Sequence, residues 1–90
     1  MSIKFMKHYV TNGTIKARVF YSAHQMVSTG ENCVTLYAKN WREGRELALI
    51  LGDSYENNTD TMSDYFEDGR ARIKAGHPLY AAALERARAA

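Results

Sequence analysis

Ninety residues with one cysteine and a net charge of +2 indicate a single compact domain, residues 1–90, without an internal disulfide. No apolar run is long enough for a membrane span or a secretory signal, so we expect a cytoplasmic protein that does not enter membranes. The charges are segregated along the chain: residues 1–52 carry seven bases and three acids, residues 53–68 carry six acids and no base, and residues 69–90 carry five bases and one acid. This pattern excludes a uniformly basic nucleic-acid binder, and a surface with both signs also permits a homo-oligomer.

The first forty residues predict a three-stranded antiparallel meander. The three segments that alternate apolar and polar side chains are residues 3–10, 14–26 and 33–39. A period of two is typical of strands that bury one face. Asn12-Gly13 between the first two segments is a strong hairpin signal, and residues 28–32 form a polar connection before the third.

One predicted face of the second and third strands interleaves bases with aromatic rings. Its members are Lys16, Arg18, Phe20, Tyr37 and Lys39. Bases that alternate with rings on a sheet are typical of a stacking platform for single-stranded nucleic acid, and the same face would suit a purine nucleotide or an acidic protein. The alternative is that the next helix covers this face, in which case Phe20 and Tyr37 are core residues.

A short middle helix is predicted over residues 41–51. Asn40 is a suitable N-cap, and Glu43 three residues later completes a weak capping box. Gly44 inside this helix costs about 1 kcal/mol relative to alanine. Gly52 is a suitable residue to end it.

The C-terminal helix is predicted over residues 79–89, which are rich in alanine. Pro78 is expected at its first position, where the missing N–H does no harm. An apolar stripe should pack against the sheet, which leaves Arg86 and Arg88 toward solvent.

Between the helices, the acidic residues 53–68 are predicted to form a connection that leads into a hairpin. The hairpin strands are predicted at residues 61–67 and 70–74, with Asp68-Gly69 as the turn. Acids on the first strand would face bases on the second. The complete prediction is an α+β fold: an antiparallel sheet of four or five strands, a short middle helix, and a C-terminal helix packed on one face.

Catalytic and metal sites are not predicted, and neither is a cofactor. If the second and third strands pair, His24 and Cys33 lie near each other, but a small apolar side chain beside an exposed histidine explains them better than a nucleophile pair does. Asn58, Asp60 and Asp64 offer oxygen ligands, yet their spacing is not that of a calcium loop and the required glycine is missing.

Four stretches carry a resemblance that extends from about Lys16 to Ala83. They are KARVFYS, CVTLYAK, the overlapping LYAKNWREG, and YENNTDTMSDYFEDGRARIKAGHPLYAAA. Together they resemble a widespread group of short uncharacterised proteins of bacterial phages, plasmids and other mobile elements. The resemblance implies a context and no activity: small accessory proteins of this kind often bind a host component, such as a defence protein or a defence signalling nucleotide.

Our leading expectation from the sequence is therefore a non-enzymatic binding protein, anti-defence or inhibitor-like, that occupies a surface of a host protein or nucleoprotein complex. Its acidic surface would present carboxylates to a basic partner, with two tyrosines as apolar anchors. The residues of this predicted acidic surface are Asp53, Tyr55, Glu56, Asn58, Asp60, Asp64 and Tyr65. The alternative is binding of single-stranded nucleic acid or a nucleotide on the basic aromatic face.

Overall fold

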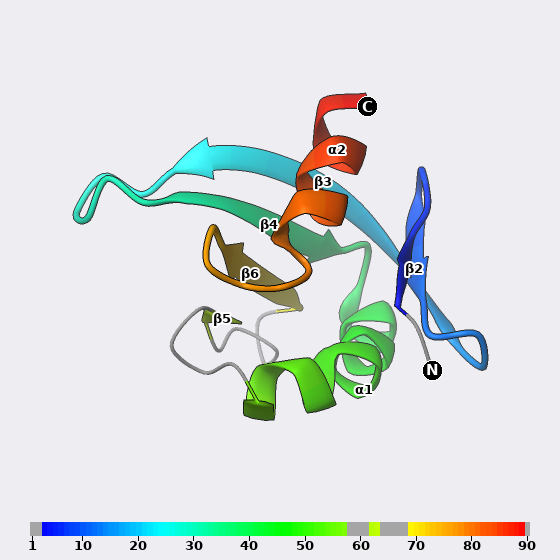
Figure 1. Cartoon of the computed structure of the whole chain (residues 1–90). Helices are drawn as coiled ribbons and strands as arrows, with labels where there is room; N and C mark the ends of the chain where they lie inside the picture. Colours follow the sequence, from blue (N-terminus) through cyan, green and yellow to red (C-terminus); the bar gives the residue numbers. More distant parts are fainter. Residues whose placement is uncertain (1–2, 58–61, 64–68, 90) are drawn as a thin grey trace.

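The computed structural model describes residues 3–57, 62–63 and 69–89, with backbone only for residues 53–57 and 62–63. Its strands are β1 (Lys4–Phe5), β2 (Tyr9–Thr11), β3 (Lys16–Gln25), β4 (Asn32–Ala38), β5 (Met62–Ser63) and β6 (Arg70–Lys74). Its helices are α1 (Trp41–Asn57) and α2 (Tyr80–Ala89) (Figure 1). All pairs among these strands are antiparallel, in the order β1-β2-β3-β4-β6-β5. The predicted α+β fold is confirmed, and two of the six described strands have only two residues each.

β3 and β4 form the centre of the sheet. Their ladder runs through seven residue pairs, from Val19 opposite Ala38 to Gln25 opposite Asn32. The predicted alternation is confirmed around the two rings, because Val19 and Leu36 are buried whereas Phe20 and Tyr37, one residue away, are exposed. It is not seen earlier in β4, where residues 33–36 are all buried. Both helices pack against β3 and β4 (Figure 1).

The hydrophobic core lies between the apolar face of the sheet and the two helices. Its buried members are Phe5, Val10, Ala17, Val19, Val34, Leu36, Leu47, Ile50, Leu51, Ala71, Ile73 and Ala83. These residues come from both helices and from five strands, so one core joins elements from both ends of the chain. Neither helix is long and apolar enough to cross a membrane, within the part of the chain that the structure describes.

The N-terminal segment, predicted as one strand over residues 3–10, is instead a tight hairpin of β1 and β2. The Met6 N–H donates to the Tyr9 carbonyl at 2.8 Å to close it. In one continuous strand Phe5 and Val10 would point to opposite faces. The hairpin places them opposite each other, and both are buried in the core.

Tyr21 secures this hairpin to β3. Its hydroxyl lies 2.7 Å from the Met6 carbonyl and 3.0 Å from the Tyr9 carbonyl, so its one proton is shared between two acceptors. Burial raises the pKa of Tyr21 to about 12, against the opposing effect of the Arg86 guanidinium. The hydroxyl therefore remains a donor at all physiological pH values.

Helix α1 extends beyond its predicted end. We expected it to stop at Gly52, but it runs to Asn57. Gly52 does not adopt the left-handed conformation of a C-terminal cap; among the described residues, the glycines with positive φ are Gly13, Gly30 and Gly69. No proline or glycine follows Gly52 in the sequence until after Asn57, so no strong helix breaker stops the helix earlier.

The second predicted hairpin is described only in part. β6 spans Arg70–Lys74 as predicted, and Gly69 has the positive φ, 72°, that the expected turn requires. Ser63 pairs with Arg72, whereas a two-residue turn with an unbroken ladder would place it opposite Lys74. The register of Ser63 therefore differs from that of the predicted hairpin. Asp68 and the rest of the first predicted strand lie outside the described residues.

Helix α2 begins at Tyr80, one residue later than predicted. The expectation that Pro78 occupies the first helical position is therefore wrong, because Pro78 lies in the turn before the helix. The buried His77 accounts for the start, because its Nδ1 accepts the Leu79 N–H at 3.0 Å and its carbonyl accepts the Tyr80 N–H at 3.0 Å. Arg86 does not point freely to solvent as expected. Its Nε donates to the Phe5 carbonyl at 3.2 Å, which connects the last helix to the first strand.

Gly44 is where α1 comes very close to the backbone beside the sheet. A Cβ built at this position would lie 2.9 Å from the Gly69 Cα, closer than real Cβ atoms approach other atoms. At Gly52, in the same helix, an added Cβ would meet no described atom within 4 Å. The two glycines therefore differ in their roles: Gly44 permits a close backbone contact, and Gly52 does not.

We predict opposite effects of alanine at these two positions. Gly44→Ala should lower the free energy of unfolding by about 1–3 kcal/mol, because the overpacked contact involves backbone on the Gly69 side. Gly52→Ala should raise it by up to about 1 kcal/mol through helix propensity alone. Urea unfolding followed by far-UV circular dichroism measures both. Equal stabilisation by the two substitutions would contradict the close contact.

Candidate functional site

The outward face of β3 and β4 is open to solvent at Phe20 and Tyr37, whereas Cys33 and Thr35, on the same face of β4, are buried. Phe20 and Tyr37 are direct partners across the two strands and are 61% and 39% exposed. Both helices pack on the other side of the sheet, against the buried residues between them. The alternative that the middle helix covers these rings is therefore wrong.

Strand β6 extends this face with further bases. Tyr37 pairs with Arg70, and Thr35 pairs with Arg72, so both arginines come from the same side of the sheet as the rings. The sequence interpretation assigned Arg70 and Arg72 only to charge pairing within their hairpin. Their membership of this face depends on β6 lying beside β4, which is a long-range pairing that no local pattern reveals.

We call this surface the basic aromatic face. Its members are the predicted Lys16, Arg18, Phe20, Tyr37 and Lys39, together with Arg70 and Arg72. Arg18, Phe20 and Lys39 line one groove of about 120 Å³ with two other residues. Lys16 lies at the β2 side of the face, where its Nζ is 5.0 Å from the Tyr9 ring centroid. The structure thus brings the predicted set together on one surface.

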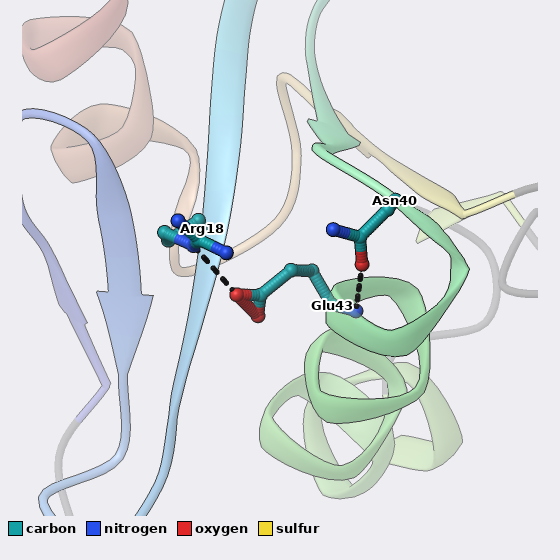
Figure 2. A network of polar contacts seen from close by, with 3 residues as sticks. All are labelled: Arg18, Asn40 and Glu43. Carbon is teal, nitrogen blue, oxygen red and sulfur yellow. Dashed lines mark hydrogen bonds and ion pairs between the residues drawn. The ribbon is translucent and has the colours of Figure 1, made fainter.

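Arg18 connects this face to the start of α1. Its Nε donates to Glu43 Oε1 at 2.8 Å, and the two side chains are 54% and 13% exposed (Figure 2). The hydrogen bond from Arg18 holds the pKa of Glu43 below its ordinary value, although burial of the carboxylate opposes this. Glu43 therefore stays ionised and holds Arg18 at the end of the face nearest α1.

The predicted capping box is only half formed. The Asn40 side-chain oxygen accepts the Glu43 N–H at 3.0 Å, as an N-cap should (Figure 2). The Glu43 carboxylate binds Arg18 rather than returning to the Asn40 backbone. An ion pair with a strand thus replaces the second capping bond and fixes the helix against β3.

His24 and Cys33 are neighbours, as the pairing of their strands predicted. Their ladder partnership leaves the Cys33 Sγ 3.5 Å from His24 Nε2, and this nitrogen also lies 2.9 Å from Thr35 Oγ1. Cys33 and Thr35 are buried, and His24 is half-buried rather than exposed. Burial raises the pKa of the Cys33 thiol, and the nearby Arg72 guanidinium lowers it by less. A buried thiol of this kind is a poor nucleophile.

The predicted acidic surface lies largely outside the described residues. Asp53, Tyr55 and Glu56 lie in the last part of α1, where their backbone is helical rather than the expected loop. The remaining members, Asn58, Asp60, Asp64 and Tyr65, fall in segments that the structure does not describe. Binding by this surface stays a prediction. No group of three His, Cys, Asp or Glu side chains that could hold a metal is found among the described residues.

Trp41 is an exposed aromatic residue that the sequence interpretation did not include in either surface. It is 72% exposed at the first position of α1, with the Arg45 guanidinium 5.3 Å from its ring centroid. The helical period of residues 41–51 could have identified Trp41 as an exposed residue. Residue 41 lies well off the apolar stripe of Leu47 and Leu51, so its ring should have been expected outside the core.

A comparison of the chain with protein-family models, curated proteins and solved structures finds no match in any of the three. The resemblance to proteins of mobile elements therefore remains an expectation from the sequence. What the structure itself establishes is the α+β fold and the composition of the basic aromatic face.

We predict that the Arg18–Glu43 ion pair makes a pH-dependent contribution to stability. The pKa of Glu43 is lowered in the folded state, so the contribution is present above its unfolded value and is lost as pH falls through the folded pKa. Glu43→Gln should cost about 0.2–1 kcal/mol at pH 7, because Arg18 is half exposed and solvent screens the pair. This difference from the parent protein should shrink toward zero as the carboxylate of the folded protein becomes protonated.

Urea unfolding of the parent and Glu43→Gln proteins in a series of buffers from neutral to strongly acidic pH measures this difference. Glu46→Gln, one turn further along α1, is the matched control for loss of a carboxylate. A Glu43→Gln deficit that stayed constant down to the most acidic buffer would show that the carboxylate charge is not its cause.

Proposed function

We propose that the protein binds single-stranded nucleic acid on the basic aromatic face. The observation that supports this most directly is the cross-strand pair of exposed rings, Phe20 and Tyr37, beside the bases Arg18 and Lys39. Exposed aromatic rings grouped on one face of a sheet are costly in water, and such apolar patches with a polar rim mark binding sites.

The two rings form one platform. Residues directly opposite each other in an antiparallel sheet have Cα atoms about 4.5–5.5 Å apart, so bases can stack on adjacent rings. Every base has a π-face, and stacking on an aromatic side chain contributes about 1–3 kcal/mol per base without strong sequence preference. Phe20 and Tyr37 would hold bases, while Arg18 and Lys39 would attract the phosphates that connect them.

A single strand fits this face better than a duplex. In a duplex the base faces are already stacked on one another, so exposed rings gain nothing from them. Both helices pack on the opposite side of the sheet, so neither is placed to enter a duplex groove from this face. Recognition by the rings therefore selects unpaired bases.

We predict that Phe20→Ala and Tyr37→Ala each weaken binding to a fluorescein-labelled oligothymidylate of about 12 nucleotides by about 5- to 150-fold, the equivalent of one lost stacking contact. Fluorescence anisotropy at low salt measures the affinity. The melting temperature of Phe20→Ala should be unchanged, because its ring is 61% exposed.

Leu49→Ala is the matched control, since this side chain is also exposed, at 70%, but lies on α1. It should bind like the parent protein. If the parent shows no binding at low salt, or if both ring variants bind normally, the proposal is wrong. If a mononucleotide binds as tightly as the oligomer, the basic aromatic face would be a nucleotide site instead.

A separate prediction distinguishes phosphate contacts from stacking. The logarithm of the affinity should fall linearly with the logarithm of salt, with a slope of about −0.7 for each phosphate contact. Lys39→Gln should make this slope shallower by about that amount, whereas Phe20→Ala should lower affinity and leave the slope unchanged. The exposed Arg88 on α2 provides the control, because Arg88→Gln should alter neither quantity. Equal slopes in all variants would remove the phosphate role of Lys39.

A further inference from the structure

We infer that the bound single strand continues from the basic aromatic face onto the start of α1, where Trp41 provides a second stacking position. This inference rests on the proposed function and extends it. It concerns a part of the molecule, the N-terminal end of a helix, that lies beyond the sheet face on which the proposal was built.

The first observation is the exposure of Trp41. Its ring is 72% exposed, although tryptophan is among the side chains with the most apolar surface to bury. The Arg45 guanidinium carbon lies 5.3 Å from the ring centroid, a cation–π distance that holds the ring in place. A solvent-exposed indole beside cationic groups is the arrangement that receives a stacked base.

The second observation is a pair of grooves that share a wall. Trp41 and Arg42 line a groove of about 280 Å³ together with Arg18, Asn40 and Glu43. Arg18 also lines the groove of about 120 Å³ that contains Phe20 and Lys39. Arg18 thus stands between the sheet platform and the indole, so a strand that leaves Phe20 passes this guanidinium before it reaches Trp41.

The distance along this path suits one short oligonucleotide. Tyr37 and Trp41 are separated by four residues, so their Cα atoms lie at most about 14 Å apart even if the connection is fully extended. Single-strand sites of sheet proteins commonly span about 4–16 nucleotides, so one ligand can reach both stacking positions. A very short oligomer would occupy only one of them.

The charges along the second groove also favour a nucleic-acid strand. Arg18, Arg42 and Arg45 surround Trp41. The described residues that line the groove include one carboxylate, that of Glu43, and it is already bonded to Arg18. A protein partner that binds through apolar contacts would be expected to contact an exposed leucine together with Trp41. The exposed Leu49, however, lies two turns further along α1 and does not line this groove. The surroundings of the ring therefore match phosphate chemistry.

The test uses the intrinsic fluorescence of the protein, because Trp41 is its only tryptophan. The protein is titrated with unlabelled oligothymidylate of about 12 nucleotides, a length within the usual range for single-strand sites. Stacking of a base on the indole should quench the emission in proportion to saturation. The anisotropy of the same labelled oligomer, measured in parallel, reports binding independently of where the strand lies.

Trp41→Ala should weaken binding of this oligomer by about 5- to 150-fold, and Trp41→Phe, which keeps a ring, should retain most of the affinity. An oligomer of about 3 nucleotides, below the usual site size, should bind Trp41→Ala as it binds the parent, because the sheet platform alone holds it. Far-UV circular dichroism shows whether each variant remains folded, and Leu49→Ala controls for loss of an exposed apolar side chain on the same helix.

The outcomes separate this inference from the proposed function. Binding by anisotropy without quenching, and with unchanged affinity in Trp41→Ala, would overturn the role of Trp41 and leave the sheet platform intact. Loss of binding in Phe20→Ala but not in Trp41→Ala would likewise overturn the second stacking position alone. Absence of any binding at low salt would remove the proposed function, and this inference with it.

Discussion

The structure depends on the fact that both helices pack on the same side of one antiparallel sheet. Because strand side chains alternate with a period of two, burying one set in the core commits the other set to the opposite face. Val19 and Leu36 are buried beneath the helices, and their neighbours Phe20 and Tyr37 are consequently left in water. The exposed rings are therefore a consequence of the strand register that also forms the core, and a slip of one residue that removed them from the surface would expose the core.

The position of α1 follows from two contacts near its start. Gly44 permits the helix to approach the backbone at Gly69, and Glu43 binds Arg18 on β3. The first contact sets the distance from the sheet, and the second sets which end of the helix adjoins the basic aromatic face. Together they place Trp41 beside Arg18. The same residues that stabilise the helix thus determine where the candidate binding path ends.

Local patterns predicted most of the fold and part of the site. Alternation correctly assigned the buried Val19 and Leu36 and the exposed Phe20 and Tyr37 to opposite sides of the sheet. It did not predict the burial of Thr35, which lies on the outward side but is covered there. The same reasoning failed for Phe5 and Val10, which have opposite parity in sequence and needed a turn between them to reach one core. It also failed at Gly52, since a glycine permits a helix end without requiring one.

The remaining errors concern pairing between distant segments. Nothing local states that β6 lies beside β4, so the place of Arg70 on the basic aromatic face could not be derived from residues 70–74 alone. The capping box likewise looked complete in sequence, but Glu43 had a better partner in a strand 25 residues earlier. For Glu43, the nearest partner in sequence was thus a poor guide to the partner in space.

The distribution of charge along α1 bears on whether a phosphate binds near the start of this helix. The positive end of a helix dipole disfavours cations by about 0.3–1 kcal/mol each, yet Arg42 occupies the first turn and Arg45 the second. Asp53 comes twelve residues after Trp41, about 18 Å along the helix axis at 1.5 Å per residue, which is beyond the screening length of about 8 Å at physiological salt. The acids at the end of α1 therefore do not relieve this cost, and the ionised Glu43 in the first turn, which also pairs with Arg18, relieves part of it. A bound phosphate would add to this compensation at the start of the helix.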